Sequence, residues 1–132
     1  MPFTRRLAVL SLLALLASGC SPRRKAEDML KKVNHSHLRE EAAVLYKQTF
    51  AGSSAPPFTA IKPDDWPANF RAFSPRHVGA FKDGFSLAIK LEGGVESGIY
   101  VVPKFMDVQP NPGRRAKFEK LDDGIYWYSF EP

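Results

Sequence analysis

Residues 76–92 read RHVGAFKDGFSLAIKLE, and this stretch is the strongest indication of fold in the chain. Asp83-Gly84 has the composition of a two-residue hairpin turn, in which both positions need positive φ. A turn at these two residues would pair Lys82 with Phe85 and would fix the register of both flanking strands. The sequence therefore predicts an antiparallel hairpin centred on this dipeptide.

The alternation of apolar residues supports the same hairpin. Side chains two residues apart along a strand share a face. In the predicted register one face carries Val78, Ala80, Phe85, Leu87, Ile89 and Leu91. Turn chemistry and alternation agree on which face is buried, so we predict one apolar and one polar face for this hairpin.

Further strands follow towards the C-terminus. After a linker, GGVESG, the stretch IYVVP at residues 99–103 predicts a third strand. Residues 117–130, KFEKLDDGIYWYSF, predict a second hairpin that turns at Asp123-Gly124 through a loop of two or three residues. Residues 104–115 contain two prolines and a glycine, and we expect an irregular loop there. Together these segments predict an antiparallel sheet of four to five strands over residues 76–130.

Residues 26–50 have the composition of helix, with two different apolar faces. One face carries Ala26, Met29, Leu30 and Val33, and the other carries Leu38, Ala42, Leu45 and Tyr46. The change occurs at residues 34–36, where Asn and Ser favour helix caps. We predict a helix that is kinked or split near 34–36. The first half is expected to be a loosely held arm and the second half to pack on the sheet.

These elements predict a single small α+β domain over residues 26–132. An N-terminal helix, over 26–50, packs on the four- to five-stranded antiparallel sheet, and residues 51–63 form a loop rich in Gly, Ser and Pro. A chain of this length can bury one core.

The first twenty residues have the layout of a secretory signal peptide. Arg5 and Arg6 precede an uncharged apolar run at residues 7–17, and small residues lead to Cys20. The run is shorter than the roughly 20 residues that span a bilayer. We therefore expect export rather than a membrane-spanning helix.

Residues 17–20, Ala-Ser-Gly-Cys, resemble the lipobox of bacterial lipoproteins, although Ala17 stands where that family usually has Leu. The resemblance covers residues 1–20. It implies a signal peptide at 1–19, lipidation of Cys20 by a diacylglyceryl group and palmitate-type acylation, and a lipidated tether at 20–25. The implied partner is membrane lipid, and the implied location is the cell envelope.

Ser21 bears on which membrane is involved. Lipoproteins retained in the inner membrane commonly carry Asp at this position, so Ser21 implies the periplasmic face of the outer membrane if the host is Gram-negative. The alternative is ordinary signal cleavage near Gly19, which would leave a free periplasmic protein with one thiol.

Charge and cysteine content exclude several function classes. The net charge is +5, and removal of residues 1–19 would lower it to +3. Export and the absence of an aromatic-basic stripe argue against nucleic acid as a partner. With one cysteine the chain has no internal disulfide. The basic cluster at residues 23–25 either contacts an anionic membrane surface or only solvates the tether.

No catalytic, cofactor or metal site is predicted. His35 and His37 have a metal-ligand spacing, but on a helix their side chains point about 200° apart. The adjacent acidic pairs at 40–41, 64–65 and 122–123 are interpreted as helix surface, cap and turn. The chain has no G-x-S-x-G elbow and no phosphate-binding Gly-rich loop. We expect a non-enzymatic protein, and the alternative is an enzyme.

The stretch IYWYSF, residues 125–130, carries aromatic residues on both faces. One face should enter the core. The other is either covered by the helix or loop 104–115, or exposed as a partner surface at Tyr126, Trp127 and Tyr128.

The expected function is a membrane-tethered binding or structural module of the envelope, which could bind an envelope protein. The alternative is a small envelope enzyme or a periplasmic enzyme inhibitor. Residues 97–100, Ser-Gly-Ile-Tyr, resemble the S-G-x-x-Y loop of periplasmic lysozyme inhibitors, with one residue fewer.

Overall fold

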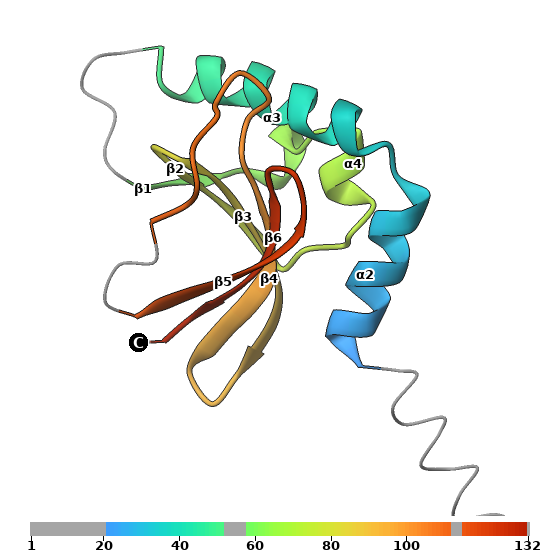
Figure 1. Cartoon of the computed structure of the whole chain (residues 1–132). Coiled ribbons are helices and arrows are strands. Elements are labelled where there is room, and N and C mark those ends of the chain that lie inside the picture. Colours follow the sequence, from blue (N-terminus) through green and yellow to red (C-terminus); the bar gives the residue numbers. More distant parts are fainter. Residues whose placement is uncertain (1–20, 52–57, 112–114, 132) are drawn as a thin grey trace, which may run out of the picture.

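The computed structural model describes residues 21–51, 58–111 and 115–131 (Figure 1). It is an α+β fold with helices on one side of an antiparallel sheet. Its elements are α2 (Pro22–Lys32), α3 (His35–Thr49), β1 (Phe58–Ile61), the 3-10 turn η1 (Pro63–Asp65), α4 (Ala68–Arg71), β2 (His77–Phe81), β3 (Gly84–Glu92), β4 (Val95–Val101), β5 (Ala116–Asp122) and β6 (Ile125–Phe130).

The sheet has six strands rather than four to five, in the order β1-β2-β3-β4-β6-β5, and all neighbours are antiparallel. The additional strand is β1, which lies inside the segment predicted as a loop. β1 has only four residues and pairs only with β2, so its apolar residues form too short a pattern to detect in the sequence.

The hairpin of β2 and β3 is present with a shifted register. Phe81 pairs with Gly84, so the turn residues are Lys82 and Asp83. A shift of two residues leaves the side chains as far as Ala88 on their predicted faces. Gly84 is the first residue of β3 and not a turn residue. It allows close packing, because a Cβ at this position would lie 2.6 Å from the Tyr100 ring and 2.7 Å from the Val101 carbonyl oxygen.

A bulge in β3 reverses the predicted faces of the residues that follow it, including Leu91. Ala88 pairs with Gly98 and Lys90 with Ser97, which leaves Ile89 without a partner. An extra residue in one strand reverses the faces beyond it. Leu91 is therefore on the opposite face from Leu87 and is 56% exposed.

The remaining strands extend the predicted pattern. β4 begins at Val95, so most of the expected linker GGVESG is strand, and only Gly93 and Gly94 form the turn. The second hairpin turns at Asp123-Gly124 through a two-residue loop, because Asp122 pairs with Ile125. The prediction of this hairpin is confirmed. Of the two loop lengths that the sequence left open, two or three residues, the structure has the shorter one.

The helical segment is split where the sequence predicts. α2 ends at Lys32, and the side chain of Asn34 accepts a hydrogen bond from the backbone N–H of His37 at 3.0 Å, which caps α3. In α3 the predicted residues Leu38, Ala42 and Leu45 are buried. They pack with the apolar face of the sheet in one core.

The expectation of a loosely held arm is wrong. α2 begins at Pro22, with Ser21 as its cap, so residues 22–25 of the expected tether are helical. Ala26 and Leu30 are 4% and 5% exposed and belong to the main core. The apolar stripe that the sequence places on this helix is therefore used for packing.

The opposite face of the sheet carries a second, smaller core. Its buried members are Tyr100, Val102, Tyr126 and Tyr128. Rings from Phe81, Phe118 and Phe130 pack on it, and the rings of Phe81 in β2 and Phe130 in β6 have centroids 5.7 Å apart. β3 and β4 lie between these two strands in the sheet order, so the sheet must curl for their side chains to meet.

This second core decides between the two alternatives that the sequence leaves open for residues 126–128: their side chains are covered. Tyr126, Trp127 and Tyr128 are 8%, 9% and 0% exposed. Trp127 lies in the main core and the two tyrosines lie in the second core, which Phe118 of β5 and Met106 cover. Tyr126, Trp127 and Tyr128 therefore do not form an exposed surface in the described part of the chain.

Candidate functional site: a groove beside α3

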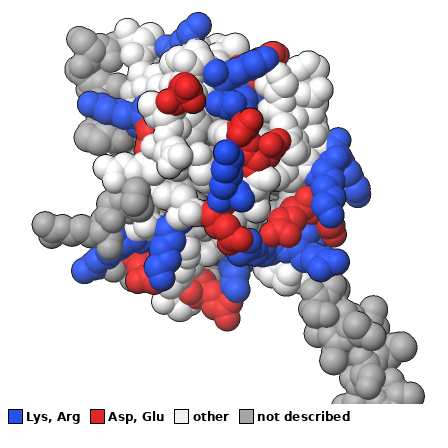
Figure 2. Space-filling view, in the orientation of Figure 1, with Lys and Arg blue, Asp and Glu red and all other residues white. Residues whose placement is uncertain are grey.

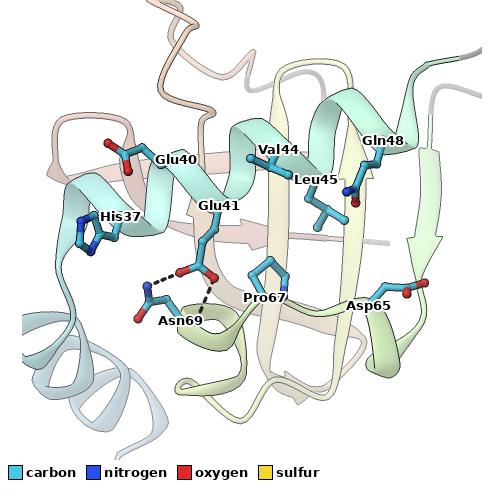
Figure 3. A pocket seen from close by; sticks show the side chains of 9 residues that line it. All are labelled: His37, Glu40, Glu41, Val44, Leu45, Gln48, Asp65, Pro67 and Asn69. Atoms are coloured by element: carbon cyan, nitrogen blue, oxygen red, sulfur yellow. Dashed lines mark hydrogen bonds between the residues drawn. The ribbon is translucent and has the colours of Figure 1, made fainter.

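The candidate site is a groove between α3 and the segment of η1 and α4 (Figure 3). Its cavity has a volume of about 450 Å³, and it is lined by His37, Glu40, Glu41, Val44, Leu45, Gln48, Asp65, Pro67 and Asn69. The α3 residues recur at helical spacing, so they lie along one stripe of the helix. We call this cavity, with the adjoining one described below, the α3 groove.

The groove has an apolar middle. Figure 3 shows Leu45 pointing down from α3 towards the opposite wall, where Pro67 lies. Val44, next to Leu45, is 59% exposed at the rim. An apolar side chain of a ligand placed here would be removed from water, which contributes about 25 cal/mol per Å² of buried apolar surface.

A hydrogen-bonded contact holds the two walls together. The carboxylate of Glu41 accepts a hydrogen bond from the backbone N–H of Asn69 at 3.3 Å and another from its side-chain amide. This contact joins α3 to the first turn of α4, whose N–H groups have no partners within the helix. Glu41 therefore fixes the width of the groove at this point.

A second cavity continues the groove towards the end of α3. It has a volume of about 360 Å³, and it shares Leu45, Gln48 and Asp65 with the first. Its wall includes four consecutive residues at 59–62, in and just after β1. β1 is the end strand of the sheet, so one of its edges has no strand beside it among the described segments.

Thr59 adds an unsatisfied polar group to this wall. Its Oγ1 atom is buried and has no hydrogen-bond partner in the described part of the chain. A buried hydroxyl without a partner costs about 1–3 kcal/mol, so a ligand that bonded to it would remove a penalty. From His37 to Thr49 the groove follows about 18 Å of helix.

The lining has more acidic than basic side chains. It contains the carboxylates of Glu40, Glu41 and Asp65, and the single cation Lys62. Glu40 is partly neutralised, because the ammonium of Lys104 lies 2.8 Å from its Oε1 and also contacts Ser36 at 2.7 Å. The hydrogen bond from Lys104 lowers the pKa of Glu40. The groove thus favours a ligand with a cationic group.

Sequence reasoning did not find this groove. The acidic pairs at 40–41 and 64–65 were expected to be helix surface and a cap, and each contributes one or two groove residues. The signal in the sequence is weak, because the wall opposite α3 comes from short elements whose positions depend on tertiary contacts.

The two histidines with metal-ligand spacing take part in different contacts. The ring of His35 contacts Asp122 and the Leu30 carbonyl oxygen, whereas His37 lines the groove. Within the described residues, no group of three or more His, Cys, Asp or Glu side chains is placed to hold a metal ion. Cys20, the predicted lipidation site, lies outside the residues that the structure describes.

A second arrangement with acid–base chemistry lies at His77. Its Nε2 is 2.6 Å from Oε1 of Glu96, and Oε2 of Glu96 accepts a hydrogen bond from the Tyr128 hydroxyl at 2.9 Å. The His77 side chain is 51% exposed, and neither His77 nor Glu96 lines the α3 groove. This trio links β2, β4 and β6 on one face, and we assign it to the structure of the sheet.

Exposed apolar side chains also lie in the loop after β4. Phe105 and Val108 are 52% and 50% exposed. The Phe105 ring packs against Tyr46 of α3 with centroids 5.5 Å apart, and the Lys47 ammonium lies 5.6 Å from its centroid. Exposed apolar groups therefore occur within residues 104–115, which the sequence predicts as an irregular loop.

Comparisons of the chain with models of protein families, with curated proteins and with solved structures found no match. None of the helices in the described part of the chain combines the length and apolar character needed to cross a membrane.

Proposed function

We propose that this chain is a lipid-anchored, non-enzymatic binding module of the bacterial cell envelope, attached to membrane lipid through Cys20. In a Gram-negative host it would face the periplasm from the outer membrane. One observation carries the proposal: the packed body begins immediately after the cysteine. Ser21 already caps α2, with its Oγ accepting from the Arg24 N–H at 3.2 Å, and Ala26 is in the core.

The direct connection has a physical consequence for an anchored protein. Each buried methylene of a lipid chain contributes about 0.8 kcal/mol, and two or three chains give stable attachment where one does not. Only Ser21 separates Cys20 from α2. The anchor would therefore hold the folded body close to the membrane surface, and the body could move only a short distance away from it. Such a module is suited to meeting partners that are themselves at the surface.

The binding site of the proposed module is the α3 groove, and its ligand is an extended segment of an envelope protein. The free edge of β1 can accept backbone hydrogen bonds from an added strand. Leu45 and Pro67 can receive an apolar side chain, and Glu41 and Asp65 lie where a Lys or Arg of the ligand would be attracted. About five extended residues would span the 18 Å of the groove.

The anchor is tested on the full chain expressed in a bacterial host. Mass spectrometry of the mature N-terminus should find a diacylated or triacylated Cys20, and Cys20→Ser should block processing and shift the protein out of the membrane fraction. Ser21→Ala is the matched control and should be processed and lipidated. Unchanged processing and fractionation of Cys20→Ser would contradict the proposal.

The groove is tested by site-specific photo-crosslinking in the same host. A photoreactive phenylalanine analogue replaces Val44 at the groove rim or Leu91 on the other side of the molecule. These positions are 59% and 56% exposed, so they are matched in accessibility. We expect a discrete adduct only from position 44, and its loss when Gln48→Trp fills the groove. Equal adducts from both positions, or an adduct that survives Gln48→Trp, would reject the groove as the site.

A further inference from the structure

The solvent face of α2 is basic along its whole length. Its exposed side chains beyond Pro22 are Arg24, Lys25, Asp28, Lys31 and Lys32. At about 100° per residue these five positions fall within an arc of about 120° on the helix. We call this set the α2 basic stripe: it has four cations and one carboxylate. Figure 2 shows Lys and Arg side chains gathered along this edge of the molecule, beside the grey N-terminal trace.

Arg23 is not part of the stripe, although the sequence groups it with Arg24 and Lys25. Its Nε donates to Oε1 of Glu27 at 2.8 Å, and its terminal nitrogen Nη2 donates to Oε2 of Glu119 in β5 at 2.7 Å. Its guanidinium also stands over the Trp127 ring at 5.4 Å from the centroid. Arg23 therefore fixes α2 to the sheet, and this leaves the stripe facing away from it.

The four cations of the stripe have no such partners among the residues that the structure describes. Asp28 is the only carboxylate on this face of the helix, whereas Glu27 is turned towards Arg23. A helix surface with a net charge of about three, extending about 12 Å, is complementary to a layer of phosphate groups. The stripe begins four residues after Cys20, which is the proposed point of entry into the bilayer.

We propose that the α2 basic stripe lies on the anionic lipid headgroups of the membrane that holds Cys20. This inference rests on the proposed lipid anchor and adds the orientation of the body. α2 lies along the surface, and β1 and the C-terminal end of α3 lie on the side of the molecule away from α2 (Figure 1). The end of the groove that residues 59–62 line therefore remains accessible to a partner.

The test uses the full mature protein, purified from membranes with its lipid and reconstituted into vesicles. One set contains phosphatidylcholine alone, and the other contains equal parts of phosphatidylcholine and phosphatidylglycerol. Acylation rates of single lysines by an amine-reactive reagent are read by mass spectrometry. Lys62 and Lys117 are internal controls, because both are exposed and lie on other elements.

We expect Lys25, Lys31 and Lys32 to react about fivefold more slowly in the anionic vesicles, because each cation near such a surface gains about 1 kcal/mol. The control lysines should react equally in both sets, and high salt should remove the difference. The double variant Lys31→Gln with Lys32→Gln should return Lys25 to its rate in neutral vesicles. The matched double variant Lys62→Gln with Lys117→Gln should not.

Equal rates for the three stripe lysines in both vesicle types would overturn the orientation. The same digest contains the N-terminal peptide, whose mass reports whether Cys20 carries lipid. A lipidated peptide with unprotected lysines rejects the stripe alone, whereas an unmodified peptide rejects the anchor on which it rests.

Discussion

His35 contacts Asp122 through Nδ1, and its Nε2 lies 2.7 Å from the carbonyl oxygen of Leu30. Both ring nitrogens thus face acceptors, so the protonated ring, which donates from both, fits the site best. The contact joins the start of α3 to the β5–β6 turn and satisfies a carbonyl in the last turn of α2. One side chain therefore connects both helices to the sheet.

This contact predicts a pH-dependent stability. The hydrogen bond to Asp122 raises the pKa of His35. Burial of the ring lowers this pKa, and the hydrogen bond to the Leu30 carbonyl raises it further, so that the net shift is upwards. The same contact with His35 lowers the pKa of Asp122. The His35 contribution is full below its unfolded pKa of about 6.5 and is lost as pH rises through the raised value. The Asp122 contribution is full above about pH 4 and is lost as pH falls through the lowered value.

Replacing His35 with Gln should lower the free energy of unfolding by about 1 kcal/mol between about pH 4 and 6.5, because the pair is half-exposed and screened. The difference in the free energy of unfolding between this variant and the wild type should become smaller at higher pH. Urea titrations at several pH values across this range measure that difference. His37→Gln, on the exposed groove rim, is the control. A deficit that grew with pH would be opposite to the sign argued above.

Arg39 in α3 clamps the loop that follows β4. Its Nε donates to the Val102 carbonyl at 2.9 Å, and a terminal nitrogen donates to Pro103 and Met106 at 3.3 Å each. Arg39→Ala should lower the free energy of unfolding by about 2 kcal/mol, because it leaves carbonyl groups without donors. Arg76→Ala, at an exposed position, should change it by less than about 0.5 kcal/mol. Chemical denaturation compares the two, and equal losses would refute the clamp.

Gly98 lies opposite the bulge in β3. A Cβ added to it would lie 1.9 Å from the Leu87 carbonyl oxygen and 3.0 Å from the Ile89 nitrogen. Gly98→Ala should therefore cost about 3 kcal/mol of stability, since backbone atoms must move. Gly93→Ala is the matched control: its φ is +60° but nothing lies within 4 Å, so the cost is about 1 kcal/mol. Similar denaturation midpoints for the two variants would disprove the close contact.

The second core predicts loss of stability at alkaline pH. Burial raises the pKa of Tyr100 and Tyr128 far above the usual value, and their contacts with Asp83 and Glu96 act in the same direction. Above about pH 10 the unfolded chain ionises these phenols and the folded chain does not, so stability must fall. Tyr128→Phe should make this fall about half as steep. Tyrosinate absorbance and the unfolded fraction should be measured together as the pH is raised. Tyr100 and Tyr128 should ionise only when the chain unfolds. Ionisation of both phenols in the folded protein would contradict the raised pKa values.

Local chemistry explains which elements the sequence could predict. Asn34 marks the split between α2 and α3, Asp123-Gly124 marks the second turn, and the alternation around Leu87 marks the buried face of the sheet. Each depends on a few neighbouring residues. β1 and the bulge at Ile89 were missed, because both depend on which strand lies beside them rather than on their own residues.

The candidate site was less predictable than the fold. Glu41 and Asp65 are ordinary surface acids in the sequence, and they line one groove only because Glu41 binds Asn69 across it. In the sequence Arg23 is likewise one of three adjacent cations in the predicted tether. Only the fold places Glu119 of β5 beside it.

By itself the sequence determined an α+β fold, the split helix, two hairpins and the buried face of the first hairpin, because helix caps, turns and side-chain alternation act within a few residues. Tertiary structure alone decided that the tyrosines of β6 are enclosed, that α2 is packed, and that a groove lies beside α3. These features arise from contacts between residues far apart in the chain, where curl of the sheet and the fit of side chains determine what is covered.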